Sequence, residues 1–421
     1  MSTLDLSWVR SQFPALRERD GGREAVFFDG PGGTQVPQRV IDAMADYLRR
    51  CNANHGGPFR TSRQSDELSL RAHEAMADFL NAPSADGIVF DANMTSMTFK
   101  MSRALSRELK PGDEIIITDL DHEGNRSPWL ALQEQGIIVE RWAFDPADCT
   151  LPLEGLAALL TPRTRLVAVG YASNAVGTVN PISDIARLAH EAGAWLWVDS
   201  VHYAPHGPID VQALDCDFLV CSPYKFFGPH AGVLWGRTEL LDRIQAYKVR
   251  PARNAPPDKF ETGTPNFEAQ AGVLGAISYL AELGERYGGA FKADFPGFAG
   301  RRLALKQAMA AIHSYERDLF GRFLAGLVEI PGLRLYGVTD PARLSSRAPT
   351  AAFRIDGMTP LAVGEHLGRH GVYVWEGNFY AIAVTEALGL EDSGGVVRAG
   401  LVHYNTAEEV EYCLNCLRRL R

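Results

Sequence analysis

Residues 195–228 read WLWVDSVHYAPHGPIDVQALDCDFLVCSPYKFFG and contain two apolar runs of strand length, 195–198 and 218–221. The first run ends in Asp199, and the second is followed by Ser222, Tyr224 and Lys225. In an open α/β sheet, ligands bind just beyond the carboxyl ends of the strands. We therefore expect the carboxylate of Asp199 and the amine of Lys225 to face one crevice.

A lysine opposite a buried acid is the arrangement that pyridoxal 5'-phosphate (PLP) requires, because the lysine forms a Schiff base and the acid holds the pyridine nitrogen. The aromatic neighbours Tyr224, Phe226 and Phe227 would keep Lys225 away from water and lower its pKa. Each residue alone has an ordinary alternative, since a lysine among aromatics often lies along a surface and an aspartate after a strand often caps a helix.

Strands and helices alternate on both sides of this stretch. Apolar runs at 88–90, 114–118, 137–142, 165–169 and 232–235 complete a set of seven predicted strands. This alternation predicts an α/β fold with a mostly parallel seven-stranded sheet that is covered on both faces. Beyond residue 263, long helical segments and short strands predict a smaller α+β C-terminal domain. We expect an N-terminal segment (1–35) that packs on the small domain, a large domain (36–290) and the small domain (291–421).

Composition excludes several classes of function. The 421 residues carry a net charge of −9, which argues against a nucleic-acid-binding surface. No apolar run approaches the length of a membrane span, and the N-terminus lacks the pattern of a signal peptide. The six cysteines are scattered, so neither a disulfide framework nor a metal site is expected. We expect a cytoplasmic protein without a membrane partner.

Further candidates lie near predicted strand ends and helix starts. Met94, Thr95 and Ser96 open a predicted helix, whose free N–H groups and hydroxyls suit a phosphate, although an ordinary N-cap is the alternative. His122 follows the predicted strand 114–118 and could stack on a flat ring, or be a structural histidine. Residues 52–63 lack periodicity and contain His55 and Arg60, which is typical of a functional or a solvated loop.

Six motifs, in order along the chain, resemble the PLP-dependent class V aminotransferase superfamily, and most closely its cysteine desulfurase-like branch. They are SNAVGTVNP (173–181), DSVH (199–202), DCDF (215–218), SPYKFFGP (222–229), ETGTPN (261–266) and RAGLVHYNT (398–406). The resemblance implies the PLP fold type I, with PLP as the cofactor, an amino acid as the substrate and a homodimer that shares its active sites.

The resemblance also implies roles for single residues. Lys225 is expected to be the Schiff-base lysine, Asp199 the partner of the pyridine nitrogen and His122 the ring-stacking histidine. Contacts to the cofactor are expected from Met94, Thr95, Ser96, Asn174, His202, Ser222, Tyr224 and, from the neighbouring subunit, Thr264. Contacts to the substrate are expected from Arg398, Asn174, His55, Arg60 and Trp375. A guanidinium suits the substrate carboxylate because it binds in a bidentate fork.

The chain departs from the desulfurases at residues 373–386, which read YVWEGNFYAIAVTE and contain no cysteine. Desulfurases carry their catalytic cysteine in this region, so we expect no persulfide chemistry. The leading hypothesis is a C–S or C–Se lyase that eliminates the β-substituent of a cysteine-like amino acid. Alternatives are an epimerase, a kynureninase-like hydrolase, an aminotransferase, or a PLP-binding protein without catalysis.

Overall fold

The computed structural model of the chain describes residues 4–20 and 22–420. Its main sheet has seven strands in the order β4 (Ile88–Asp91), β10 (Gly232–Gly236), β9 (Phe218–Cys221), β8 (Trp195–Asp199), β7 (Thr164–Gly170), β5 (Glu114–Thr118) and β6 (Ile138–Trp142). Strand β10 runs antiparallel to both of its neighbours, and all other pairs are parallel. The predicted α/β fold with a mostly parallel seven-stranded sheet is confirmed.

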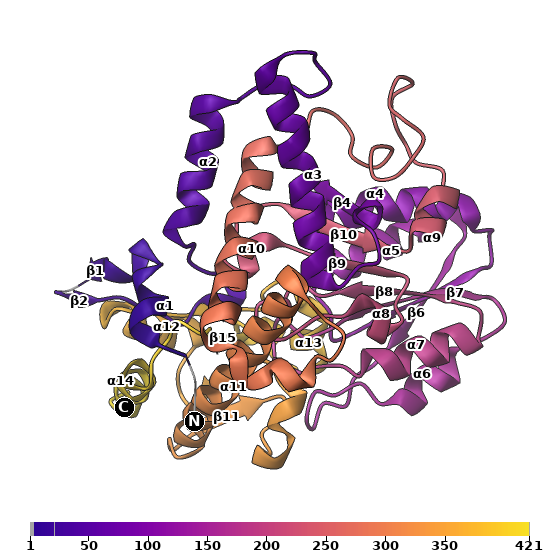
Figure 1. Ribbon diagram of the computed structural model, residues 1–421. Helices are drawn as coiled ribbons and strands as arrows, with labels where there is room; N and C mark the ends of the chain where they lie inside the picture. Colours follow the sequence, from indigo (N-terminus) through magenta and orange to yellow (C-terminus); the bar gives the residue numbers. More distant parts are fainter. Residues whose placement is uncertain (1–3, 21, 421) are drawn as a thin grey trace.

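Helices cover both faces of this sheet (Figure 1). Helices α4 (Met94–Leu105) and α5 (Ser127–Leu130) lie on one face, and α6 (Leu153–Leu159) and α7 (Ile182–Glu191) lie on the other. Side chains of a strand alternate between faces, so Ile115 and Ile117 pack with α4 while Ile116 belongs to the core on the α7 side. All three isoleucines are fully buried, which explains why β5 reads as a continuous apolar run.

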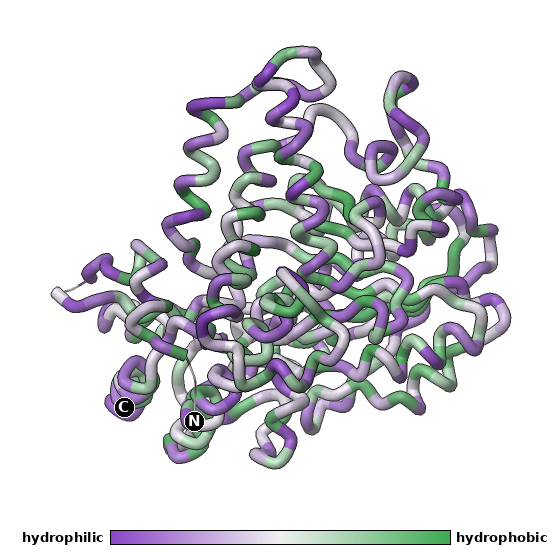
Figure 2. Tube along the Cα trace, in the orientation of Figure 1, coloured by the Kyte–Doolittle hydropathy of each residue, from purple (hydrophilic) through white to green (hydrophobic). Residues whose placement is uncertain are grey.

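Three long helices stand beside the sheet: α2 (Gln38–Arg50), α3 (Arg60–Leu80) and α10 (Phe267–Tyr287). Helix α10 packs between the other two and then against α11 (Gly300–Val328). Apolar residues concentrate along the inner faces and the sheet, and polar residues cover the outside (Figure 2). Within the described residues, no helix combines the length and apolarity that crossing a bilayer requires.

A second, antiparallel sheet follows, in the order β11 (Leu333–Tyr336), β12 (Thr350–Ile355), β15 (Val396–Gly400) and β14 (Trp375–Gly377). It contacts α11 and α12 (Pro360–Arg369), and α14 (Ala407–Arg418) packs on both of these helices. Near the N-terminus, β3 (Val26–Phe27) pairs in parallel with β13 (Val372–Tyr373). The remaining elements are α1 (Leu6–Ser11), α8 (Val211–Leu214), α9 (Thr238–Arg243), α13 (Ile382–Ala387), β1 (Arg19–Asp20) and β2 (Arg23–Glu24). The division into segments 1–35, 36–290 and 291–421 stays a prediction.

Helix α3 begins earlier than its amphipathic pattern indicates, at Arg60 rather than near residue 65. The reason is that its first turns bury serines instead of apolar side chains. Ser62 Oγ accepts a hydrogen bond from Gly57 N at 2.7 Å, and Ser65 Oγ donates to the carbonyl of Ala53 at 2.6 Å. Both serines are fully buried, so polar residues occupy the face that sequence periodicity assigns to apolar ones.

Close contact between α10 and α11 depends on Gly284. A Cβ atom at this position would lie 1.8 Å from the carbonyl oxygen of Ala304 in α11. We expect Gly284→Ala to lower the free energy of unfolding by about 1–3 kcal/mol, because the two helices must separate. The control is Gly368→Ala in α12, where a Cβ atom meets nothing within 4 Å. This control should be neutral or stabilising by up to about 1 kcal/mol, and equal effects of both variants in urea unfolding would contradict the packing argument.

Candidate active site

The carboxyl ends of β7, β8 and β9 open into a cavity of about 160 Å³. Its walls come from strand ends, from the start of α4 and from the turn after β9. The lining residues are Asn93, Met94, Thr95, Asp121, His122, Gly170, Ala172, Asn174, Asp199, Val201, His202, Ser222, Tyr224 and Lys225. The structure therefore brings most of the predicted site residues into one space.

Lys225 lies in a single helical turn, Pro223–Lys225, directly after β9. The following residues Phe226 and Phe227 are fully buried, and they anchor this turn in the core. The Lys225 amine donates to the carbonyl of Pro31 in the glycine-rich segment 29–34. Burial, together with the nearby cation Arg398, lowers the pKa of Lys225 to about 7, although the carboxylate of Asp199 opposes the shift. The amine is therefore available in its neutral, nucleophilic form near neutral pH.

Asp199 ends β8 and is 7% exposed. Its Oδ1 accepts a hydrogen bond from Val201 N at 2.9 Å. Burial raises the pKa of this carboxyl to about 7, and the neighbouring carboxylate of Asp121 adds to the rise. A cationic partner would stabilise the ionised form of this buried carboxyl and so lower its pKa again.

Asp121 is a cavity residue to which the sequence analysis assigned no role. Its carboxylate accepts hydrogen bonds from Gly170 N at 2.9 Å and from Asn125 Nδ2 at 2.7 Å. Burial raises its pKa to about 6. The sequence holds only a weak signal for it, since Asp119 and Asp121 both follow β5 and Asp119 instead pairs with Arg126 at 2.8 Å.

His122 has one contact within its own turn and one with a segment that is distant in sequence. Its Nδ1 accepts a hydrogen bond from Gly124 N at 2.8 Å, so a neutral ring carries its proton on Nε2. The ring stacks on Tyr380, with centroids 5.6 Å apart and an interplanar angle of 28°. Burial, together with the cations Lys225 and Arg398, lowers the pKa of His122 to about 4. The imidazole at the cavity wall is therefore neutral near neutral pH.

One end of the cavity has the features of an anion site. Asn93 caps α4, and its Oδ1 accepts from Ser96 N at 2.8 Å. The next residues, Met94 and Thr95, line the cavity at the helix N-terminus, where free N–H groups attract negative charge. Ser222 lines the same cavity, whereas Ser96 is exposed and is not among the lining residues.

Asn174 lines the cavity, and Arg398, which is not itself a lining residue, binds the Asn174 carbonyl. Arg398 lies on β15, is 4% exposed and donates from Nη1 to the carbonyl of Asn174 at 2.8 Å. Its guanidinium carbon lies 4.0 Å from the centroid of the Phe379 ring. Within the described residues, the buried atoms Arg398 Nε and Asn174 Oδ1 have no hydrogen-bond partner. This pair of unused polar atoms suits a polar ligand such as a carboxylate with a neighbouring donor.

The cofactor candidates His202 and Tyr224 complete the wall. His202 Nε2 hydrogen-bonds Thr350 Oγ1 at 3.0 Å, which links the large sheet to β12. The Tyr224 ring stacks on the His230 ring, with centroids 5.2 Å apart. The same Tyr224 ring lies 3.1 Å from the position that a Cβ atom of Gly33 would take. The glycine-rich segment therefore lies directly against the residue that precedes the lysine.

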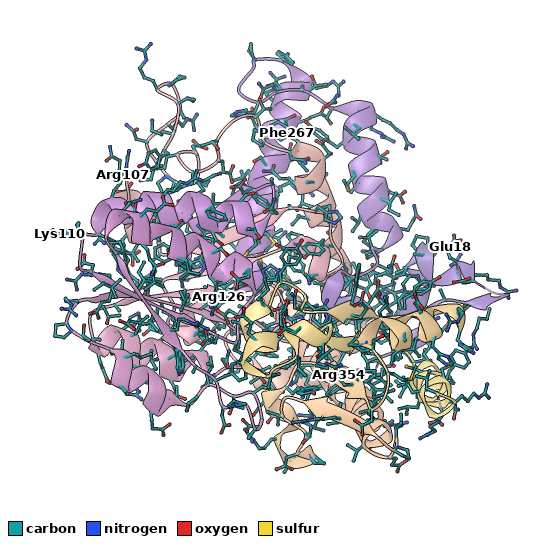
Figure 3. All side chains as sticks on the ribbon, turned by 180° about the vertical axis from the view of Figure 1, so that it is seen from behind. Glu18, Arg107, Lys110, Arg126, Phe267 and Arg354 are labelled. Atoms are coloured by element: carbon teal, nitrogen blue, oxygen red, sulfur yellow. The ribbon has the colours of Figure 1, made fainter. Side chains whose placement is uncertain are left out.

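Besides Ser96, five predicted site residues are not among those that line this cavity: Arg398, His55, Arg60, Thr264 and Trp375. His55 and Arg60 lie at the connection between α2 and α3, where His55 packs near Phe267 and Arg60 bonds Gln64. Figure 3 shows the separation: Phe267, near which His55 packs, lies toward the top of the molecule, whereas Arg126, four residues after His122, lies near its centre. Thr264 lines a different cavity, of about 210 Å³, beside α10. Trp375 is half exposed and packs on Gly32.

The cysteine-free segment 373–386 contains strand β14 and helix α13. Between these elements, Phe379 and Tyr380 adopt positive φ angles of 56° and 58°, a conformation that is strained for aromatic residues. The Phe379 carbonyl accepts a hydrogen bond from Asn174 Nδ2 at 2.9 Å, and the Tyr380 carbonyl accepts one from Glu123 N at 2.7 Å. This turn places the Phe379 ring on the Arg398 guanidinium and the Tyr380 ring on the His122 imidazole.

Known proteins are similar to this chain in sequence and in fold over nearly its whole length. The profile of the Aminotransferase class-V family matches residues 26–287 and 296–413. A cysteine desulfurase of Synechococcus elongatus is 34% identical over 99% of this chain, which spans 64% of that protein's length. An aminotransferase-like protein of Gibberella zeae is 35% identical over 99% of this chain and 98% of its own.

Solved structures agree with these sequence matches. The apo structure of a cysteine desulfurase from Thermococcus onnurineus superimposes with a TM-score of 0.86, at 27% identity, and covers 100% of this chain and 99% of its own. The resemblance and the fold type expected from the motifs are therefore confirmed. The chain belongs to the class V aminotransferase family, whose members are PLP-dependent enzymes, and its relatives include cysteine desulfurases.

Proposed function

We propose that this protein is a PLP-dependent lyase that removes the β-substituent, through C–S or C–Se cleavage, from a cysteine-like amino acid. The observation that carries the proposal is the buried Lys225 amine, with its pKa near 7, in one cavity with Asp199 and beside Arg398. The desulfurase relatives at about one-third identity support sulfur-containing substrates. The missing cysteine in the 373–386 segment separates this chain from persulfide chemistry.

The residues of the cavity fit the cofactor. Lys225 Nζ would hold it covalently, Asp199 would face the pyridine nitrogen and His122 would lie flat against the ring. The α4 N-terminus with Thr95 and Ser222 would hold the phosphate. An otherwise unpaired buried acid would then have its cationic partner. When bound, PLP serves as an electron sink for charge that develops at the substrate's α-carbon.

The chain's own side chains divide the remaining tasks. Arg398 binds the substrate carboxylate, and Asn174 orients it through the amide that also holds the Phe379 carbonyl. Lys225, once released from the cofactor, takes the hydrogen on the α-carbon as a proton at Nζ. The rings of Phe379 and Tyr380 shield this end of the cavity from water, which strengthens the electrostatic interactions inside.

The six cysteines support cleavage without a thiolate nucleophile. Five of them are buried, and Cys51 lies at the end of α2. Burial raises the pKa of Cys149 to about 11 and raises the pKa values of Cys216, Cys221 and Cys413 as well. Among the described residues that line the cavity there is no cysteine. Substrates whose sulfur or selenium group leaves without attack on that atom therefore fit best.

We further propose a homodimer with shared sites. Thr264, His55 and Arg60 lie outside their own subunit's cavity but on neighbouring elements, since His55 packs near Phe267 at the start of α10. If a second copy of the chain docks on this face, all three residues would lie beside the active-site cavity of that second copy. Trp375 is assigned to the substrate entrance of its own subunit, because it packs on the glycine-rich segment that contacts Lys225.

The substrate class is tested by offering cysteine, cysteine sulfinate, selenocysteine, S-substituted cysteines and kynurenine to the PLP-loaded protein. We expect release of pyruvate or alanine with sulfinate, selenol or S-substituted substrates, and none in Lys225→Ala, which should also lose the visible absorbance of lysine-bound PLP. Rapid persulfide formation from plain cysteine would contradict the proposal. Kynurenine cleavage, amino transfer or epimerisation would favour the corresponding alternative, and PLP binding with no turnover would favour a non-catalytic role.

The pKa of Lys225 predicts how the cofactor-free protein captures PLP. The amine is protonated below about pH 7 and neutral above it, so the capture rate should rise with pH up to about 7 and then level off. Borohydride reduction followed by peptide mapping measures the capture at Lys225. Lys306 is a built-in control, because it is equally buried but lies on α11 outside the cavity, and it should stay unlabelled. A rate that keeps rising to about pH 10, the range of an ordinary lysine, would show that Lys225 is not desolvated.

A further inference from the structure

Three aromatic side chains of the segment 373–386 adjoin the active-site cavity, and we call Trp375, Phe379 and Tyr380 the aromatic rim. The Phe379 carbonyl accepts a hydrogen bond from Asn174, and the Tyr380 ring stacks on His122. Both of these partners line the cavity. Phe379 is half-buried and Tyr380 is 71% exposed, so the rim lies between the cavity and the solvent.

Trp375 reaches the same site through the glycine-rich segment 29–34. A Cβ atom on Gly32 would overlap the Trp375 indole, so the indole lies directly on the backbone of this segment. The next residue, Gly33, lies in the same way against the ring of Tyr224, which lines the cavity. Trp375 also pairs with Arg398 across β14 and β15, and it is 51% exposed. The rim therefore adjoins both the lysine-bearing turn and the strand that carries the arginine.

The backbone of the rim indicates that its aromatic side chains have a role. Phe379 and Tyr380 have φ angles of 56° and 58°, in the left-handed region that favours glycine and asparagine. Strained residues of this kind are typical of functional sites. Neighbouring aromatic rings that remain exposed are likewise typical of a surface that binds a ligand. A ligand that covers the rings would remove the exposure of this apolar surface.

Charge at the cavity disfavours an anionic group on the substrate's β-carbon. Among the described residues that line the cavity, the basic side chains are Lys225, His122 and His202. Burial lowers the pKa of His122 to about 4 and that of His202 well below its ordinary value, so both rings are neutral. Lys225 and the adjacent Arg398 already have the cofactor and the substrate carboxylate as partners. A sulfinate would therefore have no cation of its own, whereas a neutral substituent needs none.

The cavity is also too small to enclose a large β-substituent. Its volume of about 160 Å³ is below the range of roughly 300–1,000 Å³ that is typical of sites for drug-sized ligands. The cofactor and the amino-acid part of the substrate would occupy this space. A substituent on the β-carbon would then extend to the surface of the cavity, where the apolar groups are those of the rim.

We propose that the aromatic rim binds the sulfur substituent of a cysteine conjugate, and that this substituent carries an aromatic ring. This inference rests on the proposed function and narrows its substrates to S-aryl and S-arylalkyl cysteines. The substrate's ring would lie edge-on or offset against the rings of the rim.

The reaction of such a conjugate balances without a further reactant besides water. The α-hydrogen leaves as a proton to Lys225 Nζ, and its electron pair expels the sulfur as the β-carbon–sulfur bond breaks. The sulfur takes up that proton and leaves as a neutral thiol. One water converts the rest of the amino acid into pyruvate and ammonium. No group is oxidised by an outside oxidant, and no thiolate of the protein takes part.

The first test compares S-benzylcysteine with S-methylcysteine and cysteine sulfinate, by pyruvate release from the PLP-loaded protein. We expect kcat/KM for S-benzylcysteine to exceed that for the other two by about tenfold or more, because its ring covers apolar surface of the rim. Trp375→Ser and Tyr380→Ser should lower the ratio of benzyl to methyl substrate several-fold. The matched control is Tyr247→Ser, an aromatic residue that is 54% exposed and does not line the cavity, and it should leave this ratio unchanged.

The second test measures binding without turnover. Its ligands are norvaline and δ-phenylnorvaline, in which a methylene replaces the sulfur of the methyl and benzyl substrates, so that nothing can leave from the β-carbon. We expect δ-phenylnorvaline to bind the PLP-loaded protein about tenfold more tightly, because its ring packs on the rim. In protein labelled with fluorotryptophan, it should also shift the fluorine resonance that is missing from Trp375→Phe, and norvaline should not.

Three results would each overturn the role of the rim: equal affinities of the two norvalines, an unmoved Trp375 resonance, or a preference for cysteine sulfinate over S-benzylcysteine. An affinity advantage of the phenyl ligand that disappears in Tyr380→Ser and persists in Tyr247→Ser would support it. Absence of pyruvate from every S-substituted cysteine would instead overturn the proposed function, and the binding test would still decide on the rim.

Discussion

Removal of the Lys225 amine from water is the constraint on which the active site depends. A buried ammonium is costly, and the nearby guanidinium of Arg398 makes it costlier, so the lysine is held close to its neutral form. The same burial holds Asp199 close to its neutral form, with a pKa of about 7. The cavity thus places an acid and a base where each can take a partner, and a ligand with a cationic ring nitrogen and an aldehyde would suit both.

The main sheet makes this arrangement possible. Parallel strands direct their carboxyl ends to one edge, so Asp199, Lys225 and the segment after β5 reach the same space from three separate strands. Alternating side chains of the strands fill two cores, one under the helices on each face of the sheet. The N-terminus of α4 meets this edge and adds a site for an anion.

The C-terminal part of the chain covers one side of the site. Strand β15 carries Arg398, and the strained turn at Phe379 and Tyr380 covers both Arg398 and His122. Two further contacts, from Thr350 to His202 and from Glu316 to His206, attach the second half of the chain to the wall behind the cofactor position. One wall of the cavity is therefore built where the two parts of the chain meet.

The sequence by itself determined the sheet, its strand ends and the residues that follow them. Lys225, Asp199 and His122 could be named because apolar runs mark strands, and chemistry in this fold lies after strands. Asp121 and the contacts of Phe379 with Arg398 and of Tyr380 with His122 required the tertiary structure, and so did the separation of His55 and Arg60 from the cavity. The physical reason is that periodicity records which face of an element is buried, whereas contacts such as Arg398 to Asn174, 224 residues apart, depend on how whole elements pack.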